Sequence, residues 1–365
     1  AKQHYQLAKK IFNSTKTNIS LLTGKTKTSE KKKVKKNLLE GKINLLIGTH
    51  AVFQKNITYK NLGLAIIDEQ HKFGVKQRIE ISNKGGKNCD ILLMSATPIP
   101  RTLIMTAYGD MDISKIEEKP KERKEIITLS KPEDKIEEIL FFVKKKIKDG
   151  NQVFWVCPLI EESKKLDYSA AIKKYNYLLS KFPNKIGLVH GSLNKDKKDK
   201  VLNDFLNKKI DILVSTTVIE VGIDFPNANL IIIENSNKFG LSQLHQLRGR
   251  VGRGIKQGTC ILIYKKNLSG NAKKRIKILK SSTNGFLIAE EDMKLRGFGD
   301  ILGFQQSGIK DFKLADPIHH ADLFDIAEKN IKDIEINKNN LIKYDVLLKL
   351  FDKVDVINKI DFVNN

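Results

Sequence analysis

The stretch Leu64-Ala65-Ile66-Ile67-Asp68-Glu69-Gln70-His71 joins four apolar residues directly to four polar ones. A short apolar run of this kind is typical of a strand that is buried on both faces of a parallel sheet. Two adjacent carboxylates at the end of such a strand can divide their work. One can hold Mg²⁺, usually through water, and the other can orient a water molecule for attack on a phosphate. The sequence therefore predicts Asp68 as the metal ligand and Glu69 as the water-orienting base, although an acidic pair taken alone is more often a solvated junction between a strand and a loop.

Eight short apolar runs occur along the chain, and amphipathic, lysine-rich stretches separate them. The runs are rich in β-branched residues and do not alternate strictly with polar residues, which favours strands buried on both faces. Two of the intervening stretches, 135–148 and 195–206, have the apolar spacing of amphipathic helices. This alternation of strands and helices predicts an α/β fold with parallel sheets. The predicted strands cover residues 44–48, 62–68, 91–95, 153–160, 186–189, 210–215, 230–234 and 260–264.

The predicted strands fall into two groups, which the polar segment Glu117–Lys124 separates. Two α/β units of similar type indicate a tandem pair of domains, in line with roughly 100–200 residues per domain. After Lys280 the strand pattern stops, and the sequence becomes helical in character with a glycine-rich interruption. We therefore divide the chain into a first, partial domain at 1–116, a linker at 117–131, a second domain at 132–280 and a helical C-terminal region at 281–365.

Polar residues also follow two more of the predicted strands. Ser95-Ala96-Thr97 comes after the run at 91–95, and Thr216-Thr217 comes after the run at 210–215. Ligands of open α/β sheets gather at the carboxyl ends of the strands. Because Asp68-Glu69 also follows a strand, the three clusters together predict binding sites at equivalent edges of the two sheets. Each of the two hydroxyl clusters, taken alone, is better explained by an ordinary turn or helix cap.

A cluster of arginines lies in the segment Gln246-Leu247-Arg248-Gly249-Arg250-Val251-Gly252-Arg253. Only eight of the chain's 66 basic residues are Arg, and three of these eight fall within six positions here. Arginine keeps its charge and makes bidentate contacts with phosphate oxygens, whereas lysine acts as a point charge. The cluster therefore indicates a contact with phosphate rather than a solvated basic helix end.

These motifs resemble those of the superfamily 2 nucleic-acid helicases, which hydrolyse ATP with Mg²⁺ between two RecA-like domains. The resemblance implies a fold of tandem RecA-like helicase domains with parallel sheets, of which the first is incomplete, followed by a helical hairpin region. The correspondences are motif Ib at Gly48–Ala51, motif II at Asp68–His71, motif III at Ser95–Thr97, motif V at Val214–Asp224 and motif VI at Gln246–Arg253.

The same resemblance implies roles for individual residues. Arg250 and Arg253 would be arginine fingers that stabilise charge on the transferring phosphoryl group. They are expected to face Asp68 and Glu69 across a cleft sized for a nucleotide triphosphate. The other residues so assigned are Gln70 and His71 in catalysis, Ser95, Thr97, Gly222, Asp224 and Gln246 in nucleotide binding, and Thr49, His50, Thr216 and Thr217 in contacts with the nucleic-acid backbone.

The stretch Ala289–Gly297, with the glycine-rich segment after it, resembles the translocation (TRG) motif that the RecG family shares with the transcription-repair coupling factor. In that family the motif forms a helical hairpin and loop that couple nucleotide-driven domain closure to movement on duplex DNA. The resemblance assigns this coupling to Arg296 and Gln305. The stretches 48–54 and 67–78 are similar to the RecG family rather than to the coupling factor, which typically lacks a histidine in its motif II tetrad.

The resemblance to RecG implies ATP-driven remodelling of branched duplex DNA, such as stalled replication forks and Holliday junctions, by a cytoplasmic monomer.

A net charge of +24 and a pI near 9.7 favour a polyanionic partner, although a lysine-rich proteome would also give such values. Three widely spaced cysteines without a C-x-x-C pair argue against a zinc site and suit a reducing compartment. No apolar run approaches the ~20 residues of a membrane span.

The sequence departs from the family in one respect, because it contains no G-x-x-x-x-G-K-[ST] phosphate-binding loop. Gly24-Lys25-Thr26 lacks the upstream glycine, and we interpret it as an ordinary loop. In the family, this loop, its central strand and the wedge domain precede the equivalent of Gln3-His4. We therefore expect low stability in the first domain and little ATP hydrolysis by this chain alone.

Three alternatives to a RecG-type helicase remain open. They are a non-catalytic DNA-binding module, a coupling-factor-like duplex translocase and an RNA helicase, and the stretch around Arg296 argues against the last.

Overall fold

The computed structural model describes two compact units, formed by residues 1–96 with 320–365 and by residues 97–319. Some of the predicted site residues lie outside the described residues: Gln70, His71, Thr97, Thr217, Gly222, Asp224 and Gln305. Arg296 is described by its backbone alone. The described residues are 1–54, 56–69, 84–85, 89–95, 112, 114–116, 118, 124–158, 164–216, 225–296, 323, 326–327 and 329–330.

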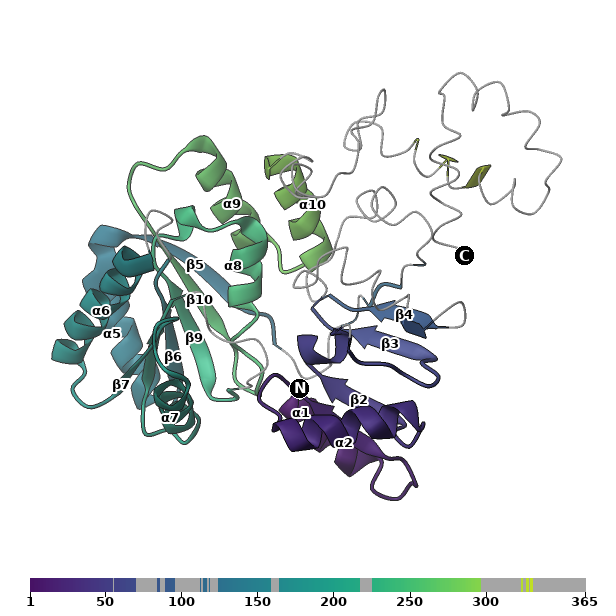
Figure 1. The fold of residues 1–365 in the computed structure, drawn as a ribbon. Helices are drawn as coiled ribbons and strands as arrows, with labels where there is room; N and C mark the ends of the chain where they lie inside the picture. Colours follow the sequence, from purple (N-terminus) through teal and green to yellow (C-terminus); the bar gives the residue numbers. More distant parts are fainter. Residues whose placement is uncertain are drawn as a thin grey trace. The chain divides into compact units, whose positions relative to one another are not determined.

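The first unit contains two separate pairs of parallel strands in its described part (Figure 1). β1 (Ile19–Leu22) pairs with β2 (Leu45–Gly48), and β3 (Leu64–Ile67) pairs with β4 (Asp90–Leu93). Among the described residues, this unit contains the helices α1 (Lys2–Ile11) and α2 (Thr28–Leu39), the short 3-10 helix η1 (His50–Phe53) and a few further helical residues. Apolar side chains on β3 and β4 are half-exposed: Leu64 at 53%, Ile66 at 55% and Leu92 at 48%. The first sheet is thus in two pieces among the described residues, and its apolar faces are only partly covered.

The second unit is built on one parallel sheet of six strands in the order β5-β10-β9-β6-β8-β7. Its central strands are buried along their whole length, because apolar side chains point to both faces. The predicted α/β fold with parallel sheets is therefore confirmed. The strands are β5 (Ile127–Pro132), β6 (Gln152–Val156), β7 (Ile186–Val189), β8 (Ile212–Ser215), β9 (Ala228–Ile233) and β10 (Thr259–Tyr264).

Helices cover both faces of this sheet (Figure 1). α5 (Ile136–Lys148) and α6 (Lys164–Lys181) pack against the face that carries Val153 and Trp155 of β6. α7 (Lys195–Leu206), α8 (Leu241–Arg248) and α9 (Gly270–Ser281) pack against the face that carries Phe154 and Val156. Successive β6 side chains thus enter opposite cores, as strand geometry requires. Among the helices that the structure describes, none combines the length and apolar character that a membrane span needs.

Two elements differ from the domain division expected from the sequence. β5 occupies 127–132, most of which we expected to be linker, and pairs with β10 from Ile127↔Thr259 to Pro132↔Tyr264. It was missed because it is an edge strand with alternating polar residues and a terminal proline, which edge positions tolerate. α10 (Gly285–Arg296), expected in a separate C-terminal region, packs against α8 and α9 within the second unit.

Candidate functional site

The acidic pair of the first unit lies where β3 ends. Ile67 is paired with Leu93 of β4, and the Met94 amide donates to the Ile67 carbonyl at 2.8 Å. Because β3 and β4 are parallel and Ile67 is paired with Leu93, both strands end at the same edge. Asp68-Glu69 and Ser95 therefore lie together at the carboxyl ends of this strand pair. The prediction that these clusters follow neighbouring strands at equivalent places is confirmed, while their roles stay predictions.

Backbone geometry separates the two carboxylates. Glu69 adopts a left-handed conformation with φ of 57°, which is costly for a residue with a side chain. Its amide donates a hydrogen bond to Asp68 Oδ1 at 2.9 Å, which stabilises this sharp turn. As a result, the Asp68 side chain is exposed whereas Glu69 is half-buried. The two neighbouring acids therefore have different surroundings, as a division of labour requires.

The acidic pair fits a magnesium ion that is held mostly by other ligands. Among the residues described by the structure, no group of three or more His, Cys, Asp or Glu side chains could enclose a metal. Mg²⁺ in nucleotide sites commonly needs only one or two protein carboxylates, because phosphate oxygens and water complete its shell. The exposed carboxylate of Asp68 meets that requirement.

Thr49 and His50 follow β2 and are both exposed. Thr49 caps the 3-10 helix η1, with the Val52 amide donating to its carbonyl at 3.0 Å, and its own amide donates to the Leu22 carbonyl at 3.3 Å. A Cβ atom on Gly48 would overlap both the Leu22 carbonyl and the Val52 side chain, so only glycine fits there. The close approach of these backbones places two polar side chains at the surface beyond the strand.

The carboxyl end of β8 differs from the expectation. Thr216 is fully buried, and its amide donates to the Val189 carbonyl at 3.4 Å. β8 lies between β6 and β7, so the residue that ends it is covered from both sides. The Thr216 hydroxyl therefore does not lie at the surface, where we had expected it to contact a nucleic-acid backbone. Nearby, partial burial lowers the pKa of His190, which directly follows β7, and favours its neutral form.

The arginine cluster begins at the end of α8. Gln246 and Arg250 are half-buried, and Arg253 is exposed. Gly252 makes the turn between the two outer arginines with a positive φ of 68°, and a Cβ atom there would lie 3.1 Å from the Gly258 backbone. After this turn, Arg253 Nε donates to the Gly249 carbonyl at 3.3 Å. The chain reverses direction at Gly252, and both Arg250 and Arg253 remain accessible to solvent.

Arg248, the first arginine of the cluster, is instead an interior residue with 2% exposure. Its Nη1 atom donates to the Leu279 carbonyl at 2.6 Å and to the Ser282 carbonyl at 2.8 Å. Both carbonyls belong to the C-terminal end of α9, where the helix dipole favours a cation. Arg248 therefore joins the end of α8 to the end of α9.

The other end of α8 is held by a residue of α10. The helix begins after Gly240, which has no side chain with which to cap it. The buried Asp292 supplies the missing acceptors: Oδ1 accepts from the Leu241 amide at 3.2 Å, and Oδ2 accepts from the Ser242 hydroxyl at 2.6 Å and its amide at 3.3 Å. A carboxylate at a helix N-terminus satisfies otherwise unpaired amides and complements the dipole. α8 is thus fixed at both ends by the two helices that follow it.

Three protein families match successive parts of this chain. DEAD/DEAH box helicase matches residues 1–106, and the helicase conserved C-terminal domain matches residues 130–254. The C-terminal part of domain 3 of the ATP-dependent DNA helicase RecG matches residues 282–360.

Individual relatives agree. The chain is 47% identical to the ATP-dependent DNA helicase RecG of Thermotoga maritima over 92% of this chain and 43% of that protein. It is 45% identical to RecG of Bacillus subtilis over 92% of this chain and 49% of that protein. The chain belongs to the RecG family. It spans a little under half the length of these RecG relatives.

Solved structures give the same assignment. A RecG bound to a three-way DNA junction is 44% identical, with a TM-score of 0.68, over 88% of this chain and 41% of that one. Saccharomyces cerevisiae Dbp5 bound to RNA is only 18% identical, with a TM-score of 0.52 over 81% of this chain and 72% of that one, and shares the fold alone. The tandem RecA-like fold is therefore established.

The capping contact of Asp292 links two of the matched segments. α8 lies in the part shared by helicase C-terminal domains, and α10 lies in the part matched by the RecG-specific family. The N-terminus of α8 is therefore held by a residue from the segment that matches the RecG domain 3 family.

Replacing Asp292 by alanine is expected to lower the free energy of unfolding of the second unit by about 1–3 kcal/mol, because buried amides of α8 lose their acceptors. Urea unfolding followed by the fluorescence of Trp155, the only tryptophan, measures it, since Trp155 is buried in β6. The control is Glu290→Ala, which removes an exposed carboxylate from the same helix and should change stability by less than about 0.5 kcal/mol. Equal stability of the two variants would disprove the capping role.

The sequence did not indicate the structural roles of Arg248 and Asp292. A signal existed for Arg248, since arginine is rare in this chain and the first arginine of the cluster lies in the periodic apolar pattern of α8 beside Leu244 and Leu247. No comparable signal existed for Asp292, because its partners at Leu241 and Ser242 are about fifty residues away in the sequence.

Proposed function

We propose that this chain is the motor part of an ATP-dependent DNA helicase that remodels branched DNA. The observation that carries this proposal is the 44% identity, over 88% of the chain, to a RecG that was solved bound to a three-way DNA junction. The match of residues 282–360 to the RecG-specific family supports it further, and it speaks against the coupling factor and against an RNA helicase. ATP and Mg²⁺ are the implied cofactors.

The proposed hydrolysis uses residues of both units. Asp68 would hold the magnesium ion, and Glu69 would orient a water molecule and accept its proton. Arg250 and Arg253 would stabilise the charge that develops on the phosphoryl oxygens. Mg²⁺, when bound, would neutralise charge between the β- and γ-phosphates. The exposure of Asp68 and Arg253 supports these assignments, because each side chain is available to a ligand. The proposal also includes Gln70, His71, Ser95, Thr97, Gly222, Asp224 and Gln246 in the nucleotide site.

The proposed contacts with DNA involve the surface residues Thr49 and His50 of the first unit. Their exposure beyond β2 supports a contact with the phosphate backbone. Arg296 and Gln305 remain the proposed translocation residues, and Thr217 remains the proposed contact from the segment after β8. For Thr216, burial of the side chain leaves a supporting role beneath this surface as the better proposal.

The 365-residue chain alone is expected to hydrolyse ATP at or near background, because its sequence contains no G-x-x-x-x-G-K-[ST] loop to hold the phosphates. Phosphate release with and without a three-way DNA junction measures this. The natural gene product is expected to hydrolyse ATP in a DNA-stimulated manner and to remodel the junction, and Glu69→Gln is expected to abolish both. DNA-stimulated turnover by the 365-residue chain that Glu69→Gln abolishes would contradict the expected inactivity, whereas a natural gene product without junction remodelling would disprove the proposed function.

A second candidate is a DNA-binding module without turnover, which the missing phosphate-binding loop favours. Both candidates bind DNA, so binding alone does not separate them. A salt titration of junction binding, run together with the ATPase assay, separates the two candidates. Salt-dependent binding by a natural gene product that hydrolyses no ATP would select the non-catalytic module.

A further inference from the structure

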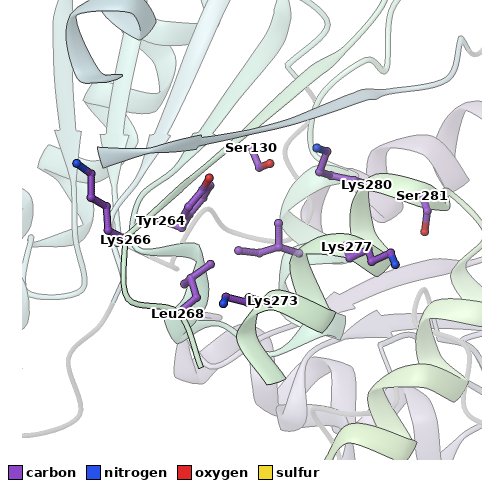
Figure 2. A pocket seen from close by; sticks show the side chains of 9 residues that line it. Ser130, Tyr264, Lys266, Leu268, Lys273, Lys277, Lys280 and Ser281 are labelled. Atoms are coloured by element: carbon purple, nitrogen blue, oxygen red, sulfur yellow. The ribbon is translucent and has the colours of Figure 1, made fainter. Parts of the chain in front are cut away.

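An open hollow of about 570 Å³ lies in the second unit beside the edge strand β5 and its neighbour β10 (Figure 2). α9 forms one wall, and the loop after β10 forms another. None of the residues that line it belongs to the candidate nucleotide or DNA site described above. Its volume is in the range of pockets that hold small organic ligands, roughly 300–1,000 Å³.

Four lysines line this hollow, and among the described residues only one of them, Lys266, has an ion-pair partner. Lys273, Lys277 and Lys280 of α9 all line it and are exposed. Within the part of the chain that the structure describes, none of the three has an ion-pair partner, and α9 contains no acidic residue. A fourth lysine at the rim, Lys266, is paired with Asp134 at 2.8 Å. Three neighbouring ammonium groups repel one another, so an anionic ligand would relieve an existing unfavourable arrangement.

The interior of the hollow is apolar and includes an aromatic ring. Tyr264, Leu268 and Ile276 line it between the lysines, and Figure 2 shows the ring of Tyr264 facing the same space as the side chains of Lys273 and Lys280. Tyr264 and Leu268 are only partly buried against the core, so part of their surface remains available. A ligand that fits this lining carries both a flat apolar group and negative charge. A nucleotide unit has both, because its base can stack on the ring while its phosphate meets an ammonium group.

The spacing of the lysines indicates more than one phosphate. Lys273, Lys277 and Lys280 are at positions i, i+4 and i+7, on one side of α9. With a rise of about 1.5 Å per residue, they span about 10 Å along the helix. Successive phosphates of one strand are about 3.4 Å apart along a B-form helix axis and further apart when the strand is extended, so the row matches two or three phosphates. A single small anion would engage only part of this row.

We propose that this lysine-lined hollow is a second nucleic-acid site that holds a single strand, with its phosphodiester backbone along α9 and one base against Tyr264. A single strand is required because paired bases are not available to stack. The site goes beyond the proposed helicase function, which depends on other residues, and it gives the second unit a contact with an unpaired strand of its DNA substrate.

The first experiment measures binding of a fluorescein-labelled 20-nucleotide oligo(dT) to the full chain across a salt titration. The variant is K273Q/K277Q/K280Q. It is expected to bind about tenfold more weakly at low salt, and the slope of log K against log salt should become shallower by about 2, since each phosphate contact of a single strand contributes about 0.7. The control K145Q/K148Q/K173Q removes the same charge from exposed positions of α5 and α6, on the opposite face of the sheet. It should leave the slope within about half a unit of the wild-type value.

A second experiment locates the strand. A benzophenone amino acid in place of Ser281, which lines the hollow, is expected to crosslink to the labelled oligonucleotide. The same amino acid in place of Ser180, an exposed residue of α6, is expected not to. The crosslink at 281 should disappear in K273Q/K277Q/K280Q and decrease in Tyr264→Leu. Because this readout needs no ATP hydrolysis or junction remodelling, it separates failure of this site from failure of the proposed helicase function.

Three results would overturn the proposal. The first is an equal change of slope in the two lysine variants, which would mean that only net charge matters. The second is equal crosslinking from positions 281 and 180. The third is displacement of the strand from position 281 by millimolar inorganic phosphate at constant ionic strength, which would identify a site for a small free anion.

Discussion

Replacing Arg253 by alanine is expected to lower DNA-stimulated ATP hydrolysis by the natural gene product about 10³-fold or more, the effect of losing an arginine finger. Arg253 is exposed beyond the Gly252 turn, and the half-buried Arg250 lies on the other side of that turn. A guanidinium in such a place can donate two hydrogen bonds to the phosphoryl oxygens as their charge develops. Arg250→Ala should cause a loss of similar size. Steady-state phosphate release at saturating ATP measures both, so that the loss appears in kcat.

The variant Arg253→Lys separates shape from charge. Lysine keeps the positive charge but cannot form the bidentate contact, so most of the loss should remain. The control is Lys256→Ala, which removes an exposed cation three residues further along and should leave kcat unchanged. Full activity in Arg253→Ala would remove Arg253 from the catalytic assignment, and full rescue by lysine would reduce its role to general electrostatics.

The parts of the fold that the sequence predicted correctly are those determined by local pattern. The predicted helix at 195–206 matches α7, and the predicted strand at 186–189 matches β7. The other predicted strands were found with shifts at their ends, because apolar residues such as Cys157 continue into the core after the ladder stops. β1 and β5 were missed. Each is short or partly polar, and each becomes a strand only because a partner, β2 or β10, is available beside it.

The candidate site also contains some features that local sequence pattern predicted and others that it did not. The position of Asp68 and Glu69 follows from an apolar strand and was predictable, whereas the left-handed backbone of Glu69 was not. Thr216 was expected to contact a nucleic-acid backbone because its segment resembles motif V and hydroxyls at a helix start suit phosphate. Its burial depends on neighbouring strands that come from distant parts of the sequence. Tertiary packing, which residue spacing does not encode, decides which polar residues at a strand end reach solvent.

Tertiary packing also distinguishes the three arginines at 248, 250 and 253. Of these, only Arg248 is expected to be essential for folding. Arg248→Ala should lower the free energy of unfolding of the second unit by about 3–5 kcal/mol. The side chain is 2% exposed and donates to the Leu279 and Ser282 carbonyls, with a weaker contact to Thr128 Oγ1 at 3.4 Å. Burial lowers the pKa of its guanidinium, which nevertheless stays protonated. Alanine would leave buried carbonyls without donors and a cavity between α8 and α9.

Two further variants identify the cause of that loss. Arg248→Met fills most of the volume but donates no hydrogen bond, so it should recover only the packing part, leaving a cost of about 2 kcal/mol. Arg253→Ala is the matched control, because it removes an exposed arginine five residues away and should change stability by less than about 0.5 kcal/mol. Urea unfolding followed through Trp155 measures all three variants in the same unit. If Arg248→Ala unfolds at the same urea concentration as Arg253→Ala, the bonds from α8 to the end of α9 do not stabilise this domain, and α8 is held against the helices that follow by Asp292 and by apolar packing.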